Sequence, residues 1–397
     1  MNIVQIATYP IEKPLHGGQI RVNEISKELK RLGANVINVS YSEPSHRYFN
    51  KDLDFIINPA SLEKYEKTPY CTDLATSIMS QSEEDFSSHL LKSIAGKNID
   101  YIFIEQMWLW PMIKRLLKES KISGKSKIVY SSHNIEFLTK EALLSSNGIQ
   151  NYDDAIKKIK EIETDLVLNS DIIISCSKSD YEFYSEMNLD AVSILCPNGV
   201  SLKEINPETL ERVKDGIGDR KFALFVGSAY PPNAQGFWSV IGESVAWLSM
   251  DEMIVAAGGC SNILEDFMPT EYDIYRYLNF EKIKRVGFLD DDELCALIHL
   301  CSAIILPITV GGGSNLKTAE AIISNKPVIS TSVACRGYDF CDELSNFYIC
   351  DDREGFINAI KASLRNERME LSENELNLRS SVLWNNALKG LEFLVDN

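Results

Sequence analysis

The stretch Ala303–Ser330, AIILPITVGGGSNLKTAEAIISNKPVIS, decides the fold because it alternates two kinds of secondary structure within one short segment. Its ends, Ala303–Leu306 and Pro327–Ser330, are apolar runs typical of buried strands in a parallel sheet. Between them, apolar residues recur at helical spacing from Leu316 to Ile323. The pattern predicts a strand, a glycine loop, a helix and a second strand, which together form one unit of a doubly wound sheet.

The same alternation of strand and helix runs along the chain and starts again near residue 220. The first series of expected strands comprises Ile3–Ala7, Val36–Ser40, Tyr101–Glu105, Ile128–Ser131, Ile172–Ser175 and Val192–Leu195, and the second comprises Phe222–Val226, Met253–Ala257, Arg285–Gly287, Ala303–Leu306, Pro327–Ser330 and Phe347–Ile349. The polar segment 197–220 connects the two series.

The sequence therefore predicts an α/β protein with two doubly wound, Rossmann-like domains, residues 1–200 and residues 201–379. We expect the two domains to face a ligand cleft, because ligands of such sheets bind beyond the carboxyl ends of the strands. The last stretch, Leu378–Val395, has a helical pattern. Two interpretations stay open for residues 380–397, which pack either on the first domain or on the second.

Composition restricts the class of protein. The chain has 397 residues, of which 45% are hydrophobic and 24% charged, and its formal net charge is −17. This acidity argues against a nucleic-acid partner, since such binding needs an excess of Lys and Arg. The nine cysteines show no metal-binding spacing, so we expect buried, reduced thiols. Because no leader and no apolar run of about 18 residues is seen, we expect a cytoplasmic protein without a membrane span.

The glycine loop within Ala303–Ser330 is expected to bind phosphate. Its backbone amides would lie at the positive end of the following helix, which is a natural anion site. Lys317 and Glu320 share one face of that helix, where the lysine can contact phosphate and the glutamate can accept hydrogen bonds from ribose. The expected donor-binding residues of this segment are Gly311, Gly312, Gly313, Ser314, Asn315, Lys317 and Glu320.

Two other interpretations apply to the same loop. A plain tight turn with Ser314 as helix N-cap is disfavoured, because three glycines exceed what a turn requires. A Walker A loop of an NTPase would place Gly311 and the Lys317–Thr318 pair correctly, but Leu316 occupies the position of its second glycine.

Two further candidates follow strands of the first series. Gly17 and Gly18 come after the first strand and precede an amphipathic helix, so phosphate or sugar could approach their backbone closely. They do not form a dinucleotide-binding fingerprint. His133, in SSHNIEF, is expected at the carboxyl end of the strand that begins at Ile128. For this histidine, catalytic and structural roles have equal weight.

Taken together, these segments resemble the retaining glycosyltransferases of family 4 (the "group 1" type), in the variant with a Gly-Gly-Gly-x-x-Leu-Lys pattern. The likeness is carried, in order along the chain, by HGGQIRVNEISKELKRLGANV, SSHNIEF, NSDIIISCSKSDYEFY, SILCPNGVSL, FALFVGSAYPPN, KRVGFLDDDELCALI, the Ala303–Ser330 stretch and LWNNAL. The resemblance implies the two-domain GT-B architecture. It also implies transfer of a sugar, with retention of configuration, from a nucleoside-diphosphate sugar to a saccharide, glycolipid or other glycoconjugate in polysaccharide or glycan biosynthesis.

The resemblance also assigns roles to residues. The second domain would hold the donor and the first domain the acceptor. His133 would lie close to the transferred sugar, Glu320 matches the second glutamate of the family's Glu-x(7)-Glu motif, and Gly227 would contact the donor together with the glycines already named. The resemblance implies neither a metal ion nor another cofactor.

The sequence departs from the family at two positions. Gly312 stands where the motif's first glutamate is expected, and no basic residue occurs from Ser228 to Met250, where an Arg and a Lys usually hold the pyrophosphate. Lys317 is the nearest substitute cation, ahead of Arg21 and Arg336. These departures keep an alternative open, namely a non-catalytic GT-B subunit that scaffolds or activates a partner transferase.

One segment has a charge opposite to that of the chain. Residues 108–127 combine Trp108 and Trp110 with six basic residues and a single acid, Glu119. The favoured interpretation is a helix that covers the sheet, with a solvated basic face and buried tryptophans. The other is weak peripheral contact with anionic lipid at the inner face of a membrane.

Overall fold

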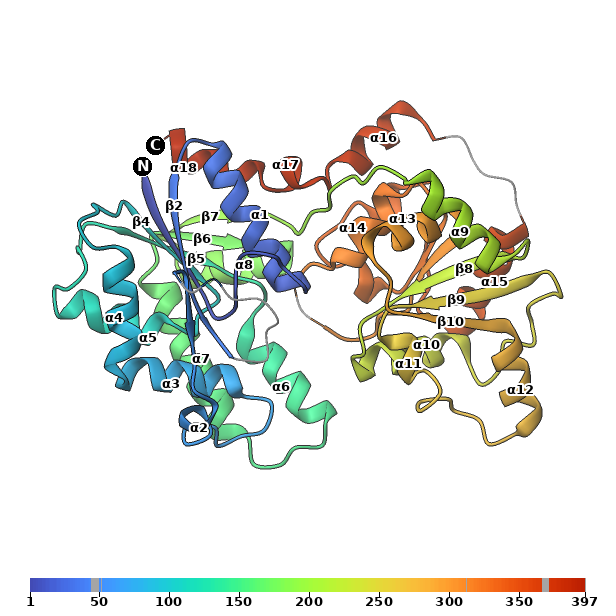
Figure 1. Ribbon diagram of the computed structural model, residues 1–397, viewed down its shortest axis with the longest axis horizontal. Helices are drawn as coiled ribbons and strands as arrows, with labels where there is room; N and C mark the ends of the chain where they lie inside the picture. The colour runs from blue at the N-terminus through green and yellow to red at the C-terminus, as the bar shows by residue number, and fades with distance from the viewer. Residues whose placement is uncertain (44–49, 51, 312, 366–370, 397) are drawn as a thin grey trace. The chain divides into compact units, whose positions relative to one another are not determined.

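The computed structural model describes residues 1–43, 50, 52–311, 313–365 and 371–396. The chain forms two compact units. The first comprises residues 1–198, 312–314 and 387–397, and the second comprises residues 199–311 and 315–386. Figure 1 shows that each unit is built on one sheet with helices around it. All strand pairs within both sheets are parallel.

The first unit contains a seven-stranded sheet in the order β3-β2-β1-β4-β5-β6-β7. Its strands are β1 (Asn2–Ala7), β2 (Asn35–Ser42), β3 (Asp54–Ile56), β4 (Tyr101–Glu105), β5 (Lys127–Ser131), β6 (Ile172–Ser175) and β7 (Val192–Leu195). The strand order reverses at β1, which lies between β2 and β4. The carboxyl ends of β1 and β4 therefore form the point where a doubly wound sheet binds ligands.

Among the described residues, the helices that connect these strands are α1 (Gly17–Arg31), α2 (Pro59–Leu62), α3 (Thr72–Ser82), α4 (Glu84–Ser93), α5 (Trp110–Lys118), α6 (Glu136–Ser146), α7 (Asp153–Leu168) and α8 (Lys178–Met187). Helix α1 shows why the sequence folds this way. Val22, Ile25 and Leu29 recur at helical spacing and are completely buried. The helix is followed by Gly33, whose φ of 88° favours glycine.

The second unit contains a six-stranded sheet in the order β10-β9-β8-β11-β12-β13. Its strands are β8 (Lys221–Val226), β9 (Glu252–Ala257), β10 (Ile283–Gly287), β11 (Ala303–Leu306), β12 (Val328–Ser330) and β13 (Phe347–Ile349). Alternate residues of β8 pack on opposite faces: Phe222 and Leu224 belong to one hydrophobic core, and Ala223 and Phe225 to another. The strand order reverses at β8, between β9 and β11.

The helices of the second unit are α9 (Pro207–Ile217), α10 (Pro231–Ile241), α11 (Cys260–Ile263), α12 (Asp273–Lys282), α13 (Asp291–Leu300), α14 (Leu316–Ile323), α15 (Arg353–Arg365) and α16 (Glu373–Ser380), with short 3₁₀ turns at Ser332–Cys335 and Cys341–Glu343. The chain then continues through α17 (Trp384–Ala387), the 3₁₀ turn η3 (Lys389–Glu392) and α18 (Phe393–Asp396). The last of these segments group with the first unit.

The predicted α/β fold class is confirmed, and every strand predicted from the sequence is present. The sequence did not predict β3, which is an edge strand of three residues. The prediction of one helical stretch over Leu378–Val395 is wrong. Val200 forms a parallel bridge with Leu383, and its carbonyl accepts the amide of Trp384, which interrupts the helix between α16 and α17.

Candidate functional site

His133 lies in the loop after β5, at the carboxyl edge of the first sheet. Its Nε2 is 3.2 Å from Oε2 of Glu105, the last residue of β4, and its Nδ1 is 3.2 Å from the hydroxyl of Tyr9, which follows β1. The Glu105 carboxylate also accepts a 2.7 Å hydrogen bond from Gln5 Nε2. When a carboxylate oxygen of Glu105 accepts from Nε2, that nitrogen carries the ring proton and Nδ1 accepts from the Tyr9 hydroxyl.

Burial determines the charge of this cluster. The side chains of His133 and Glu105 are 9% and 0% exposed. Burial lowers the pKa of His133, although the hydrogen bond and the charge of Glu105 oppose this shift. Burial also raises the pKa of Tyr9 well above its usual value. The imidazole is therefore neutral at neutral pH, with both ring nitrogens hydrogen-bonded inside the first unit.

Gly18 lies against this cluster. A Cβ at Gly18 would be 3.0 Å from the Tyr9 hydroxyl oxygen and 3.6 Å from His133 Nδ1, so glycine allows α1 to approach the pair closely. Gly17 and Gly18 are the first residues of α1, so the expectation of a glycine loop before the helix is corrected. The N-cap is His16, whose side chain accepts the amide of Gln19.

A second group of polar residues surrounds Glu136, the first residue of α6. Gln106 Nε2 donates a 3.1 Å hydrogen bond to Glu136 Oε1, and Gln106 has a left-handed φ of 60°. Such backbone strain in a residue other than glycine is concentrated at functional sites. Burial and the nearby charge of Glu163 raise the pKa of Glu136 to about 8. Glu136 is thus a protonated acid at neutral pH, which the sequence alone did not indicate.

Glu163 of α7 stabilises the start of α6. Its carboxylate accepts the amides of Glu136 and Phe137, at 3.0 and 3.2 Å, and the hydroxyls of Tyr130 and Tyr184, at 3.0 and 2.6 Å. A carboxylate at a helix N-terminus satisfies free amides and interacts favourably with the helix dipole. This residue fixes the position of the loop that carries His133.

Arg21 of α1 is a buried cation, only 1% exposed. Its Nη1 donates to the carbonyl oxygen of Cys196 at 2.8 Å and to Asn198 Oδ1 at 3.3 Å, whereas Nε and Nη2 have no hydrogen-bond partner among the described residues. Its positive charge also acts on His133 and Tyr9. A buried guanidinium with free donors is suited to bind an anion.

The end of the glycine loop groups with the first unit. Gly313 has a φ of 62°, and a Cβ there would fall 2.2 Å from the carbonyl oxygen of His133. The Ser314 hydroxyl accepts the amide of Asn198 at 2.9 Å, and the Ser314 carbonyl oxygen accepts Asn198 Nδ2 at the same distance. Gly312, the position of the missing glutamate, lies outside the described residues.

Lys317 belongs to the second unit, on α14. Its Nζ donates to Asn233 Oδ1 at 3.2 Å, and Asn233 Nδ2 donates in turn to the carbonyl and hydroxyl oxygens of Ser228, at 3.0 and 3.2 Å. Burial lowers the pKa of Lys317, while the charges of Cys260 and Glu320 oppose this shift. The helix N-cap is Asn315, whose side chain accepts the Lys317 amide, and not Ser314 as the turn interpretation required.

Gly227 brings two loops of the second unit into contact beside this lysine. A Cβ at Gly227 would be 2.8 Å from Cys260 Sγ, and a Cβ at Gly258 would be 2.4 Å from the Gly227 carbonyl oxygen. The loops after β8 and β9 therefore pack backbone against backbone. Gly311, which has a φ of 140°, lies beside Arg336, since a Cβ there would be 2.8 Å from Arg336 Nη2.

Glu320 lines a cavity of about 260 Å³ in the second unit. Lys203, Asp291 and His299 also line this cavity. Burial raises the pKa of Glu320, and the charges of Lys203 and Lys317 oppose the shift. The structure thus gathers Gly227, Lys317 and Glu320 in the second unit, and Gly18, His133, Gly313 and Ser314 in the first.

Two features of the described residues bear on cofactors and membranes. No group of three or more His, Cys, Asp or Glu side chains is arranged to hold a metal ion among them. Independence from metal nevertheless stays a prediction. In the same part of the chain, no helix combines the length and the apolar character that crossing a bilayer requires.

Comparison with known proteins relates this geometry to solved structures. No family model matches the chain, and no curated protein matches it. Sucrose-phosphate synthase from Thermosynechococcus elongatus superposes with a TM-score of 0.70 at 16% identity, covering 100% of this chain and 98% of the other. Anabaena HepE in complex with UDP gives 0.68 at 12%, covering 100% and 99%. The catalytic domain of Arabidopsis thaliana starch synthase IV, bound to ADP and acarbose, gives 0.63 at 14%, covering 100% and 98%.

At these identities the likeness establishes the fold alone. The chain has the GT-B fold, in which two Rossmann-like sheets, here of seven and six strands, are joined in one polypeptide. The assignment of donor, acceptor and catalytic residues depends on the chemistry of the two residue groups described above.

Proposed function

We propose that this GT-B-fold chain is a retaining, metal-independent glycosyltransferase that transfers a sugar from a nucleoside-diphosphate sugar to a saccharide, glycolipid or other glycoconjugate. The observation that carries the proposal is the half-buried Lys317 ammonium at the reversal point of the second sheet. It is held 3.2 Å from Asn233, and Glu320 lies on the same helix. Two solved neighbours support the donor class, since HepE is described in complex with UDP-glucose and starch synthase IV with ADP.

In this proposal, stabilising the leaving diphosphate is the main catalytic task. Lys317 and the amides at the start of α14 would bind the diphosphate, replacing the two basic residues that are missing after Gly227. Glu320 would accept hydrogen bonds from the ribose. A raised pKa is consistent with this role, because burial disfavours the charged form of the carboxylate.

The first unit would position the sugar and the acceptor. A neutral His133 can form a hydrogen bond with a sugar hydroxyl when its contact with Tyr9 or Glu105 is broken. In the tautomer with the proton on Nε2, Nδ1 is the acceptor. Arg21, whose buried Nε and Nη2 have no partner among the described residues, adds positive charge near the same residues. We do not assign a carboxylate nucleophile, since Glu105 is already hydrogen-bonded to Gln5 and His133.

Thermal-shift and calorimetric titrations with UDP, ADP, GDP and dTDP test the proposal. At least one diphosphate should stabilise the protein, and Lys317→Ala should weaken that binding by about 1–3 kcal/mol, because a charge-assisted contact is lost. The matched control is Lys214→Ala on exposed α9, which should leave binding unchanged.

The proposal fails if no diphosphate binds and no donor is hydrolysed across a panel of nucleotide sugars. Unaltered affinity in Lys317→Ala would move the phosphate contact to another cation. Magnesium-dependent ATP hydrolysis would instead support the Walker-type interpretation of the glycine loop.

The alternative of a non-catalytic GT-B subunit is favoured by the glycine at position 312 and by the absence of basic residues from Ser228 to Met250. It predicts that His133→Ala and Glu320→Ala leave the activity of the parent complex intact. Loss of that activity in either variant rejects it.

A further inference from the structure

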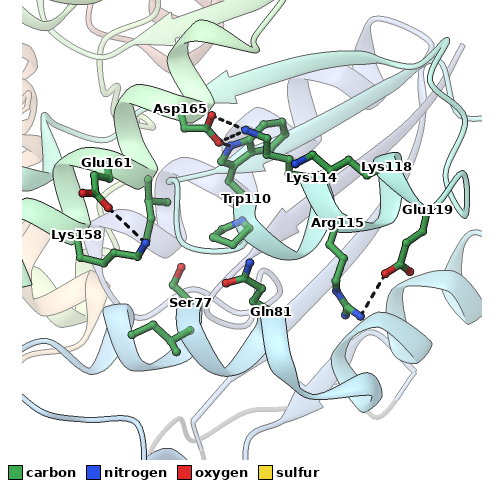
Figure 2. A pocket seen from close by; sticks show the side chains of 13 residues that line it. Ser77, Gln81, Trp110, Lys114, Arg115, Lys118, Glu119, Lys158, Glu161 and Asp165 are labelled. Atoms are coloured by element: carbon green, nitrogen blue, oxygen red, sulfur yellow. Dashed lines mark hydrogen bonds and ion pairs between the residues drawn. The ribbon is translucent and has the colours of Figure 1, made fainter.

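The helical layer of the first unit contains a pocket that the proposed transfer reaction does not use. It has a volume of about 570 Å³ and lies between α3, α5 and α7 (Figure 2). This volume is in the usual range for small-molecule sites. None of the residues proposed above to bind donor or acceptor lines the pocket, whose wall is formed by Ser77, Ile78, Gln81, Trp110, Pro111, Lys114, Arg115, Lys118, Glu119, Lys158, Glu161, Ile162 and Asp165.

Two polar atoms on the wall, the Ser77 hydroxyl and Arg115 Nε, have no hydrogen-bond partner within the part of the chain that the structure describes. Ser77 on α3 is completely buried, and its hydroxyl has no hydrogen-bond partner among the described residues. Arg115 on α5 uses Nη2 to bind the Ser87 hydroxyl, but its Nε is buried without a partner in the same part of the structure. Buried donors without a partner are unfavourable, and a ligand with acceptor oxygens would supply the missing partners.

Positive charge is in excess at one end of the pocket. Near Trp110, Lys114 is neutralised by Asp165 at 2.5 Å, and Lys158 lies 3.4 Å from Glu161. At the opposite end of α5, Glu119 is 2.8 Å from Lys121 but 3.9 Å from Arg115.

Lys118 is exposed at this same end, and none of the described residues forms an ion pair with it. The uncompensated positive charge is therefore at the Arg115–Lys118 end, in a chain whose net charge is −17. Figure 2 shows Arg115 pointing toward Glu119, with Ser77 and Gln81 on the neighbouring helix.

The other walls are apolar and aromatic. Trp110 is 2% exposed, and its Nε1 donates to Asp165 at 2.7 Å, which fixes the ring. Trp108 and Trp110 are both buried, as the favoured interpretation of residues 108–127 expected, and contact of the basic face with anionic lipid stays a prediction. The basic side chains of α5 remain beside a pocket with an apolar wall and hydrogen-bond donors.

We propose that this α3–α5–α7 pocket is an accessory site for a phosphate group carried by a saccharide or by a lipid headgroup. Arg115, Lys118 and the Ser77 hydroxyl would donate to the phosphate oxygens, since cations and hydroxyls together suit an oxyanion. Trp110, Pro111, Ile78 and Ile162 would contact the remainder of the ligand. A phosphate-bearing acceptor held here would be bound independently of the donor.

The test measures binding to two probes without measuring transfer activity. The first probe is inorganic phosphate, followed by ³¹P line broadening, and the second is phosphatidylglycerol vesicles in a sedimentation assay, with phosphatidylcholine vesicles as reference. Lys118→Gln and Ser77→Ala alter the pocket. Lys125→Gln is the matched control, because it removes the same charge from an exposed position of the same basic segment that does not line the pocket. Lys317→Ala reports on phosphate bound at the proposed donor site.

For a free phosphorylated ligand, Lys118→Gln should raise the Kd for phosphate about ten-fold, and Ser77→Ala should raise it several-fold, with Lys125→Gln unchanged. For a lipid headgroup, vesicle binding should fall in Lys118→Gln and persist in Lys125→Gln. Either pattern supports the site. Equal losses in Lys118→Gln and Lys125→Gln, phosphate binding lost only in Lys317→Ala, or no binding of either probe would overturn it. Failure of the proposed transferase activity would leave these measurements interpretable.

Discussion

Individual residues around His133 show how burial sets their protonation states. The imidazole is neutral because its charged form is poorly solvated, whereas Glu136 is kept protonated for the same physical reason. The two groups lie three residues apart, on the loop and the helix that Glu163 holds in place. Titratable residues whose pKa values are shifted in opposite directions are characteristic of sites that move or share protons.

Glu136 gives a prediction about stability. Its pKa is raised from 4.5 to about 8 in the folded chain. Between these values the folded state holds a proton that the unfolded state has lost, so this residue lowers stability as the pH rises. The Glu136→Gln protein has no ionisable group at this position. Its free energy of unfolding, relative to that of the unaltered protein, should therefore increase from pH 5 to pH 8, by up to about 1.4 kcal/mol per pH unit.

Urea denaturation at pH 5, 6, 7 and 8 measures this difference. The control is Glu161→Gln on α7, which makes the same substitution at a carboxylate that is 53% exposed. If the difference in unfolding free energy between Glu136→Gln and the unaltered protein does not change with pH, Glu136 is already ionised in the folded state.

The sequence indicated part of the residue-level site. Gly18, His133 and Lys317 stood out because glycine loops and polar residues at the ends of predicted strands are local signals. Tyr9, Glu105 and Asn233 were not predicted to be their partners. These contacts join residues 124, 28 and 84 positions apart, and no periodicity in a single sequence encodes such pairing.

At the level of elements, strands were more predictable than terminal helices. Buried parallel strands are continuous apolar runs, and their positions need no knowledge of their neighbours. The stretch from Leu378 to Val395 shows the contrary case. Val382, Leu388, Leu391 and Leu394 are all buried as the pattern indicated, yet a tertiary bridge to Val200 divides the stretch into separate turns.

The loops after β8 and β9 provide a prediction at this level. Gly258 has a φ of 79°, and a Cβ there would fall 2.4 Å from the Gly227 carbonyl oxygen. Gly258→Ala should destabilise the protein by more than about 2 kcal/mol, since both the left-handed backbone and the clash are unfavourable. It should also displace the loop beside Asn233 and thereby weaken nucleoside-diphosphate binding.

Chemical denaturation measures the first effect and calorimetry the second. Gly216→Ala in α9 is the control, because no atom lies within 4 Å of its added Cβ. That substitution should be neutral or stabilise the helix by up to about 1 kcal/mol. Similar stabilities for the two variants would mean that the loops after β8 and β9 can separate at little cost.

On the scale of the whole molecule, the first compact unit is not one continuous piece of the chain. The chain leaves the first unit after Asn198, forms the second unit, and ends at residues 387–397 in the first. The sequence left open which unit these last residues join, because an apolar stripe specifies burial without naming the surface that it contacts. Their burial makes the stability of the first unit depend on the end of the chain.

Removal of residues 387–397 should therefore destabilise the first unit selectively. Leu388, Leu391 and Leu394 are at most 2% exposed, and a Cβ at Gly390 would be 2.6 Å from Ile194 Cγ2 of β7. Each buried leucine contributes about 1.5–3 kcal/mol, so their sum is comparable to the net stability of an ordinary domain. In hydrogen exchange, amides of β6 and β7 should exchange at least about 100-fold faster, while those of β8 and β9 keep their protection.

A chain lacking only residues 396–397 is the control and should exchange like the full protein. Unchanged protection of β7 after the longer truncation would mean that the first unit is stable without the C-terminal segment, and equal losses in β7 and β8 would mean that the two units unfold together.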